Sequence, residues 1–214
     1  MTWATTQLAD VCAAALAVPV LASSSYLVAL AALSAKNEPP AAPGAWPRFD
    51  VIIPAHDEEA NVAATVASVL AVDYPRELFR VVVVADNCAD ATAARARLAG
   101  AHVIERVDAE RRGKGFALAR AFEETLARGE ADAVVVVDAD TRVSPNLLCA
   151  FAARIAAGEA AVQAEYGVRN PESSWRTRLM VLALALFHGV RSRARERVGV
   201  SCGLRGNGMA IAVS

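Results

Sequence analysis

The chain has 214 residues, enough for one covered-sheet domain with an appendage. Hydrophobic residues make up 55% of it, more than a soluble globular domain usually has, and a formal net charge of −1 gives no sign of nucleic-acid binding. The four cysteines and three histidines are scattered and form no Cys-x-x-Cys pair, which argues against a zinc centre, a redox centre or a Ser-His-Asp triad.

The first predicted element is a long apolar helix near the amino terminus. Residues 11–35 form a stretch of 25 residues without a charge, long enough to span a hydrocarbon core of ~30 Å. A cleaved signal peptide is disfavoured because no Lys or Arg precedes this stretch, which also exceeds a typical signal core. Lys36 and Arg48 follow it while Asp10 precedes it, so the positive-inside rule places the remaining chain in the cytoplasm. We therefore expect residues 1–36 to form a single-pass anchor in the cell membrane.

A change in composition after this anchor predicts a linker. Four prolines and one glycine lie between Asn37 and Pro47, and such a composition cannot continue a helix. We assign residues 37–48 to a proline-rich linker and residues 49–214 to a globular domain.

The globular domain alternates between β-branched apolar runs and segments with apolar residues at helical spacing. Strands are predicted at Phe49–Ile53, Phe79–Val84, His102–Glu105, Ala133–Val137 and Ala160–Tyr166. Helices are predicted at Glu59–Ala71, at Lys114–Arg128 and from Ser144-Pro145 onward. This alternation predicts an α/β fold with a mainly parallel sheet and right-handed crossovers.

Two carboxylates follow the most strongly apolar of these strands. The valines 134–137 run directly into Asp138-Ala139-Asp140, and positions two apart in an extended chain point the same way. Open α/β sheets bind ligands at this end of their strands. Mg²⁺ and Mn²⁺ take one or two carboxylates plus substrate phosphates, so a metal-bound nucleotide diphosphate is the expected ligand. The alternative is that Asp138 and Asp140 end the strand and cap the next helix.

Acidic residues also follow the first two predicted strands, at Asp57 and at Asp86 and Asp90. They are expected to meet Asp138 at one edge of the sheet. The alternatives are a helix-dipole role for Asp57 and an Asx turn at Asp86 to Asp90.

Glycine-rich phosphate cradles are missing from the expected positions. The first strand is followed by Pro54-Ala55-His56-Asp57-Glu58-Glu59 rather than Gly-x-Gly-x-x-Gly. Gly113-Lys114-Gly115 lacks the upstream glycine and the Ser or Thr of a P-loop. The phosphates are therefore expected to meet a metal and a cation such as Lys114, unless that lysine is simply solvated.

Four motifs stand in order along the domain: Val51–Glu58, Val84–Thr92, Arg111–Gly115 and Asp138–Asp140. Together they resemble the family 2 glycosyltransferases, which have the nucleotide-diphospho-sugar transferase fold called GT-A, a Rossmann-like mainly parallel sheet. The resemblance runs from Phe49 to about Ile211.

The resemblance implies a role for each matched residue. Ala55 and Asp57 would border the nucleotide, and Asp86 would face its base. Asp138 would lie by the ribose and diphosphate and, with Asp140, at a Mn²⁺ or Mg²⁺ ion. The implied nucleotide-sugar site comprises Pro54, Ala55, Asp57, Asp86, Arg112, Lys114, Asp138, Ala139 and Asp140.

Two later segments complete the prediction. Gly203–Gly208 resembles the family's acceptor-side loop, with Gly206 and Asn207 on the acceptor side. Trp175–Arg197 has an apolar centre with arginines at both ends. It is predicted either to lie on anionic lipid or to pack as a domain helix with a solvated basic end.

The resemblance implies a metal-dependent inverting glycosyltransferase that moves a sugar from a nucleotide-diphosphate donor to a polysaccharide, lipid or glycolipid acceptor at the cytoplasmic membrane face. The family's catalytic base is an acidic residue beyond the acceptor-side loop, and no Asp or Glu follows Asn207. The base is therefore unknown and expected beyond Ser214, with the domain lacking its acceptor and base portion. The alternatives are a truncated donor-binding module without turnover, and a sugar-phosphate nucleotidyltransferase.

Overall fold

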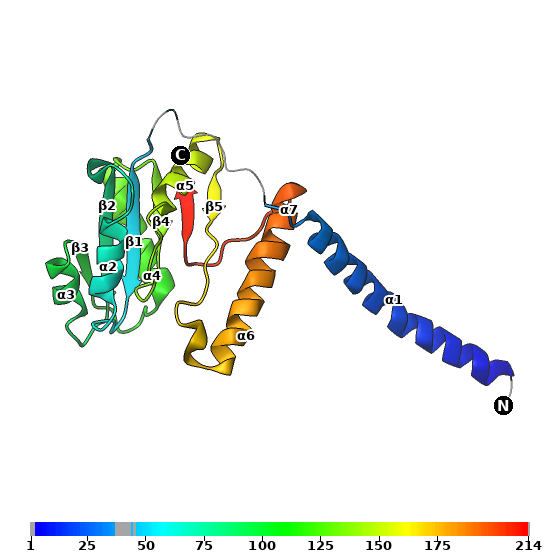
Figure 1. Ribbon diagram of the computed structural model, residues 1–214. Helices are drawn as coiled ribbons and strands as arrows, with labels where there is room; N and C mark the ends of the chain where they lie inside the picture. Colours follow the sequence, from blue (N-terminus) through cyan, green and yellow to red (C-terminus); the bar gives the residue numbers. More distant parts are fainter. Residues whose placement is uncertain (1–2, 37–43, 45, 214) are drawn as a thin grey trace. The chain divides into compact units, whose positions relative to one another are not determined.

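The structure is a computed structural model that describes residues 3–36, 44 and 46–213 (Figure 1). The chain divides into two compact units. The smaller unit comprises Met1–Asn37 and Glu165–Gly203, and the larger comprises Glu38–Ala164 and Leu204–Ser214. Pro39, Pro40 and Pro43 of the predicted linker lie outside the described residues.

The larger unit is built on a six-stranded sheet with the order β3-β2-β1-β4-β6-β5. The strands are β1 (Phe49–Ala55), β2 (Phe79–Asp86), β3 (His102–Arg106), β4 (Ala133–Val136), β5 (Ala161–Gln163) and β6 (Met209–Ala212). Strands β1 to β4 run parallel, while β6 is antiparallel to both β4 and β5. The predicted α/β fold with a mainly parallel sheet is confirmed.

The far side of this sheet differs from the prediction in two respects. Strand β6 was not predicted, because two of its four residues are alanines, which have low strand propensity. It gains its place by pairing along β4, with Met209 opposite Val136. Strand β5 is shorter than the predicted Ala160–Tyr166, since the chain enters the smaller unit at Glu165.

Helices cover both faces of the sheet, and the alternation of side chains along each strand decides which helix a residue meets. One face carries α2 (Val62–Leu70), α3 (Thr92–Leu98) and α5 (Leu147–Ala156), which pack on residues such as Val51 and Val83. The other face carries α4 (Lys114–Arg128), which packs on residues such as Ile52 and Val82. Because both faces are covered, the central strands β1, β2 and β4 each contain a continuous apolar run.

The helix boundaries follow local chemistry. Helix α4 spans the predicted residues and ends at Gly129, which adopts the left-handed conformation (φ 63°) at the C-cap. Helix α2 begins at Val62 rather than Glu59, because the backbone N–H groups of Glu58 and Glu59 donate to side chains at the start of α3 and in the loop before it. Helix α5 begins at Leu147, since Asn146 occupies the N-cap position. Helix α3 was not predicted.

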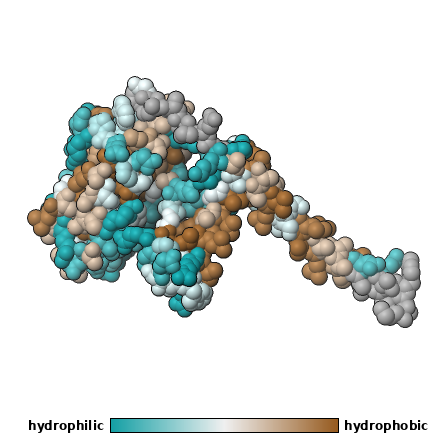
Figure 2. Space-filling view, in the orientation of Figure 1, coloured by the Kyte–Doolittle hydropathy of each residue, from teal (hydrophilic) through white to brown (hydrophobic). Residues whose placement is uncertain are grey.

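The smaller unit contains α1 (Trp3–Leu33), α6 (Trp175–Leu184), the π-helix η3 (Ala185–Ser192) and α7 (Arg193–Arg197). Within α1, Asp10–Leu33 is 24 residues long with a mean hydropathy of 2.0, which is long and apolar enough to cross a membrane by length and composition. Figure 2 shows hydrophobic side chains along most of its visible surface. Helix α7 contacts α1, where Arg195 donates to the Tyr26 hydroxyl at 3.3 Å. Arg197 donates to the carbonyl of Ala35, just beyond the end of α1, at 2.9 Å.

Two 3₁₀ turns complete the described elements, η1 (Arg76–Leu78) and η2 (Pro171–Ser173). Residues 175–197 are helical, as predicted, but the π-helical segment in their middle was not predicted. There the Ser192 hydroxyl donates to the Phe187 carbonyl five residues earlier, at 2.9 Å. The backbone pattern of a π-helix leaves no distinctive composition in the sequence.

Candidate functional site

The parallel strands of the larger unit bring their carboxyl ends to one edge of the sheet. In register, Ala55 at the end of β1 lies opposite Ala85 of β2, and Asp86 at the end of β2 lies opposite Arg106 of β3. Asp138 follows on the chain just after β4, which pairs with β1 on its other side. The predicted meeting of post-strand residues at one edge therefore follows from the observed strand order.

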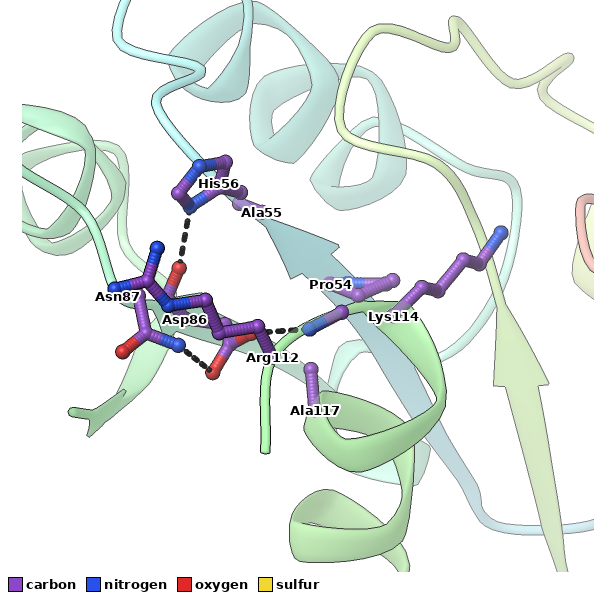
Figure 3. Close-up of a pocket in the computed structure, with 9 residues that line it drawn as sticks. Pro54, Ala55, His56, Asp86, Asn87, Arg112, Lys114 and Ala117 are labelled. Carbon is purple, nitrogen blue, oxygen red and sulfur yellow. Dashed lines mark hydrogen bonds between the residues drawn. The ribbon is translucent and has the colours of Figure 1, made fainter. Parts of the chain in front are cut away.

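A cavity of about 270 Å³ opens at this edge, beside the ends of β1 and β2 and the first turn of α4 (Figure 3). Five of the predicted donor-site residues line it: Pro54, Ala55, Asp86, Arg112 and Lys114. Four further lining residues were not predicted: His56, Asn87, Gly113 and Ala117. His56, Asn87 and Gly113 are positions of the motifs to which no role was assigned, and Ala117 lies outside the motifs.

Asp86 is the buried charge of this cavity, with 4% of its surface exposed. Its Oδ1 accepts a hydrogen bond from Arg106 at 2.6 Å and one from the Asn87 side chain at 3.0 Å. Its Oδ2 accepts from the backbone N–H of Gly113 at 3.3 Å. The His56 ring meets the backbone carbonyl of Asp86 at 2.7 Å and thereby joins the loops after β1 and β2 (Figure 3).

The turns after β1 and β2 both contain a residue in the left-handed backbone region. Asp57 and Asn87 each have φ of 52°, a conformation that Asp and Asn tolerate better than other non-glycine residues. The Asn87 side chain supports its turn by accepting a hydrogen bond from the backbone N–H of Asp108 at 2.8 Å. The backbone therefore turns sharply at the cavity after both β1 and β2 instead of continuing as a strand.

The Asp57 side chain does not line the cavity but joins the two loops. Its Oδ1 accepts a hydrogen bond from the backbone N–H of Ala89 at 2.7 Å. In the reverse direction, Asp90 accepts from the backbone N–H of Glu59 at 3.0 Å. Partial desolvation acts to raise the pKa of Asp90, but hydrogen bonds from the hydroxyl and N–H of Thr92 and from Glu59 outweigh it and hold that pKa below its ordinary value.

Asp57, Cys88 and Asp90 offer potential metal-ligand atoms that all lie within 4.8 Å of one another. The carboxylates of this group are already engaged by backbone N–H groups of the facing loops. Burial raises the pKa of the Cys88 thiol, which disfavours the thiolate that binds metals. We therefore regard this group as a link between the two loops.

Lys114 connects the cavity to the residues after β4. Its ammonium group contacts a carboxylate oxygen of Asp138 and donates to the backbone carbonyl of Gly206 at 2.7 Å. Asn207 accepts a hydrogen bond from the backbone N–H of Asp138 at 3.0 Å and donates to the Thr141 hydroxyl at 3.1 Å. Of the two residues predicted on the acceptor side, Asn207 bonds directly to the Asp138 turn, and Gly206 is joined to it through Lys114.

Asp138 and Asp140 can offer oxygen ligands to a metal. Lys114 contacts one of the two Asp138 carboxylate oxygens, which leaves the other. Asp140 is exposed, and within the described chain its carboxylate has no hydrogen-bond or ion-pair partner. The Ala139 between them is buried, and its carbonyl accepts from the Thr65 hydroxyl at 2.6 Å, which fixes the turn on α2. Two such carboxylates fit Mg²⁺ or Mn²⁺, which take hard oxygen ligands and retain places for phosphate oxygens.

Known proteins resemble this chain in sequence and in fold. Residues 47–214 match the family described as glycosyltransferase-like family 2. The chain belongs to this family. A solved structure shares its fold: a mannosyltransferase from Pyrobaculum calidifontis, solved with GDP-Man and Mn²⁺, is 22% identical with a TM-score of 0.65 over 96% of this chain and 55% of its own.

Two further relatives are more similar in sequence to this family 2 chain. Glucosyl-3-phosphoglycerate synthase from Mycobacterium tuberculosis, solved with UDP, is 25% identical with a TM-score of 0.50 over 86% of this chain and 59% of its own. Beta-monoglucosyldiacylglycerol synthase from Synechocystis sp. is 29% identical over 173 residues, which are 78% of this chain and 35% of that protein. The chain therefore spans about a third of the curated relative that it matches.

Proposed function

We propose that this chain binds a nucleotide-diphospho-sugar together with Mn²⁺ or Mg²⁺ at the carboxyl ends of β1, β2 and β4. In the complete enzyme the sugar would pass, with inversion, to a polysaccharide, lipid or glycolipid acceptor at the cytoplasmic face of the cell membrane. The observation that carries this proposal is the cavity that joins a buried carboxylate, Asp86, to the cation Lys114, which itself contacts Asp138.

The two ends of this arrangement suit the two ends of a donor. An ionised carboxylate accepts hydrogen bonds only, so Asp86 suits the N–H groups of a nucleobase. Lys114 and Arg112 line the cavity and supply positive charge for a diphosphate. The Mycobacterium tuberculosis relative was solved with UDP, which has both of these features.

Asp140 and Asp138 are the residues that would hold the metal, and when bound the metal supplies positive charge against the leaving diphosphate. The protein's own residues position the two carboxylates and neutralise the charge of the diphosphate. Ala139 and Asn207 fix the backbone that carries the two carboxylates, and Lys114 lies where it can shift from Asp138 to a phosphate oxygen.

In the proposed transfer, an acceptor oxygen attacks the anomeric carbon as the bond from that carbon to the phosphate oxygen breaks. An acidic residue takes the acceptor proton, and we assign this base to no described residue. Gly206 and Asn207 would face the acceptor, because the loop that carries them meets the Asp138 turn.

The apolar helix α1 supports a membrane location for the acceptor. Its segment Asp10–Leu33 has the length and composition of a membrane span, and the curated relative is named as a synthase of a glycolipid. Arg195 contacts Tyr26 of α1, and Arg197 contacts Ala35 just beyond its end, so positive charge lies near the end of the helix that precedes Lys36. By the positive-inside rule, this charge supports a cytoplasmic location for the globular domain.

The proposal is tested by calorimetric titration of the full chain in detergent with UDP-glucose and with GDP-mannose in the presence of Mn²⁺, beside the Asp140→Ala variant and a sample with a chelator. We expect one of the two donors to bind, and its binding to require both Mn²⁺ and Asp140. Binding that persists unchanged in Asp140→Ala and in the chelated sample contradicts the proposed metal site.

A further inference from the structure

The two oxygens of the Asp86 carboxylate have unequal partners. Oδ1 accepts from Arg106 at 2.6 Å and from Asn87 at 3.0 Å. Among the described residues, Oδ2 accepts from one donor, the backbone N–H of Gly113, at 3.3 Å. A carboxylate oxygen can accept two hydrogen bonds, so Oδ2 retains acceptor capacity beside the cavity that Asp86 lines.

Arg106 holds this arrangement from outside the cavity. It is the register partner of Asp86 on the neighbouring parallel strand, and it is not among the described residues that line the cavity. Its second nitrogen donates to Asp108 at 3.0 Å, and its guanidinium lies 5.6 Å from the centre of the Phe116 ring in the first turn of α4. Arg106 is therefore held on three sides and can fix the rotamer of Asp86.

An ionised carboxylate with one oxygen still available as an acceptor distinguishes nucleobases by whether the ring nitrogen that faces it carries a hydrogen. Uracil and guanine carry an N–H at N3 and N1, which can donate to Oδ2. Cytosine and adenine carry a lone pair at the corresponding ring position, which would face the carboxylate oxygen and repel it. The exocyclic amino groups of cytosine and adenine can donate, but from the neighbouring ring position. A site built to receive the ring N–H therefore loses affinity for a base whose ring nitrogen cannot donate, because its polar group is left unpaired.

We infer that Arg106 is a specificity-determining positioning residue: by holding Oδ1 of Asp86, it directs Oδ2 at the base and selects uracil or guanine over cytosine or adenine. This inference rests on the proposed function, since it concerns the same donor site. Arg106 lies outside the four motifs that marked the site in the sequence. Its role follows from the strand register and from the different hydrogen-bond partners of the two Asp86 carboxylate oxygens.

The test is calorimetric titration of the full chain in detergent with UDP, CDP, GDP and ADP, each with Mn²⁺. The pairs UDP/CDP and GDP/ADP compare donor with acceptor at the ring nitrogen within one base class. Loss of a hydrogen bond to a charged group predicts that wild type prefers the N–H base of its favoured pair by about 10- to 100-fold. The variants are Arg106→Met, Arg106→Lys and, as a control, Arg97→Met, which removes an exposed arginine that pairs with Glu105 on β3.

We expect Arg106→Met to reduce this preference to within about threefold. The variant should mainly weaken binding of the favoured nucleotide, because that nucleotide loses its hydrogen bond to Oδ2. Arg106→Lys keeps the charge but loses the planar guanidinium, so its preference should lie between those of wild type and Arg106→Met. Arg97→Met should keep the wild-type preference. If Arg106→Met does not fold, Arg106→Lys carries the same test.

A purely structural role for Arg106 would weaken both nucleotides of a pair equally. An unchanged preference in the folded Arg106 variants therefore overturns the inference while leaving the proposed function standing. A wild-type chain that binds none of the four nucleotides with Mn²⁺ refutes the proposed donor site itself, and the inference with it.

Discussion

Two aspartate–arginine pairs join neighbouring parallel strands of this sheet, one near each end of β2. Asp50 and Arg80 are register partners between β1 and β2, as Asp86 and Arg106 are between β2 and β3. All four side chains are largely buried, with 9% and 22% of the side-chain surface exposed in the first pair and 6% and 14% in the second. Burial and pairing therefore do not separate a structural pair from a functional one.

The pairs differ in how completely the carboxylate is satisfied. Both oxygens of Asp50 are bound by Arg80, at 3.0 and 2.6 Å, and one also accepts from the Thr125 hydroxyl at 2.7 Å. Asp86 has its strong partners on one oxygen and a single long hydrogen bond on the other, beside a cavity. A buried carboxylate that keeps an available oxygen indicates a ligand, while a fully satisfied one indicates a structural role.

The largest expected effect comes from breaking the structural pair. Arg80→Met leaves the Asp50 carboxylate buried without its cation, and removing one partner of a buried ion pair costs about 3–5 kcal/mol. The free energy of unfolding, measured with urea, should fall by that amount. A loss below about 1 kcal/mol, the usual worth of an exposed pair, would show that the Asp50 pair is not the structural one.

A smaller loss is expected from Thr125→Val, which keeps the shape of the buried side chain and removes its hydrogen bond to Asp50. Hydrogen bonds to charged groups contribute about 1.5–3 kcal/mol, and we expect the free energy of unfolding to fall within that range. Thr92, buried beside Asp90, offers a matched comparison on the functional side of the sheet. An unchanged stability in Thr125→Val would mean that Arg80 alone satisfies Asp50.

Lys114→Met tests the functional side. Its ion pair with Asp138 is about two-fifths exposed, so the free energy of unfolding should change by less than about 1 kcal/mol. Affinity for the donor nucleotide with Mn²⁺ should fall by about 10- to 100-fold, the value of a charge-assisted hydrogen bond. Arg120→Met, an exposed position on the same helix, serves as the control and should bind normally. Equal affinities in both variants would remove Lys114 from the site.

The smallest expected effect is a change in stability at acidic pH. Burial acts to raise the pKa of Asp50, but hydrogen bonds from Arg80 and Thr125 outweigh it, so the folded-state pKa is lowered. Its stabilising contribution is therefore complete above the unfolded value of about 3.9 and is lost as the pH falls through the folded value. The stability difference between wild type and Thr125→Val should shrink below about pH 4. A difference that stays constant down to pH 2 would exclude this linkage.

Much of the fold could be predicted because its strands are β-branched runs and α4 has clear boundaries. The valines of β4 and the carboxylates that follow them also predicted the edge where the cavity lies. Strand β6 could not be predicted from its own residues, since its pairing partner, β4, supplies its stability. Arg106 was missed for a related reason, because only the register of β2 and β3 reveals that it meets Asp86.

The site residues show where motif-based prediction stops. The sequence also allows Lys114 to be a solvated lysine, but the structure joins it to Asp138 and Gly206 through contacts that span up to 92 positions in the sequence. Asp57 was expected beside the nucleotide, and the structure turns its carboxylate to the backbone of the facing loop. Such contacts depend on how two loops meet, and no local pattern encodes them.

We propose above that Asp140 and its neighbours form a metal-dependent donor site. Calorimetric titration of the full chain in detergent with UDP and with GDP, with and without Mn²⁺, decides this for wild type and Asp140→Ala. We predict that one nucleotide binds wild type only with Mn²⁺, and that Asp140→Ala abolishes this binding without changing the melting temperature. Metal-independent binding that Asp140→Ala leaves intact would contradict the claim, as would no binding of either nucleotide by the folded wild-type chain.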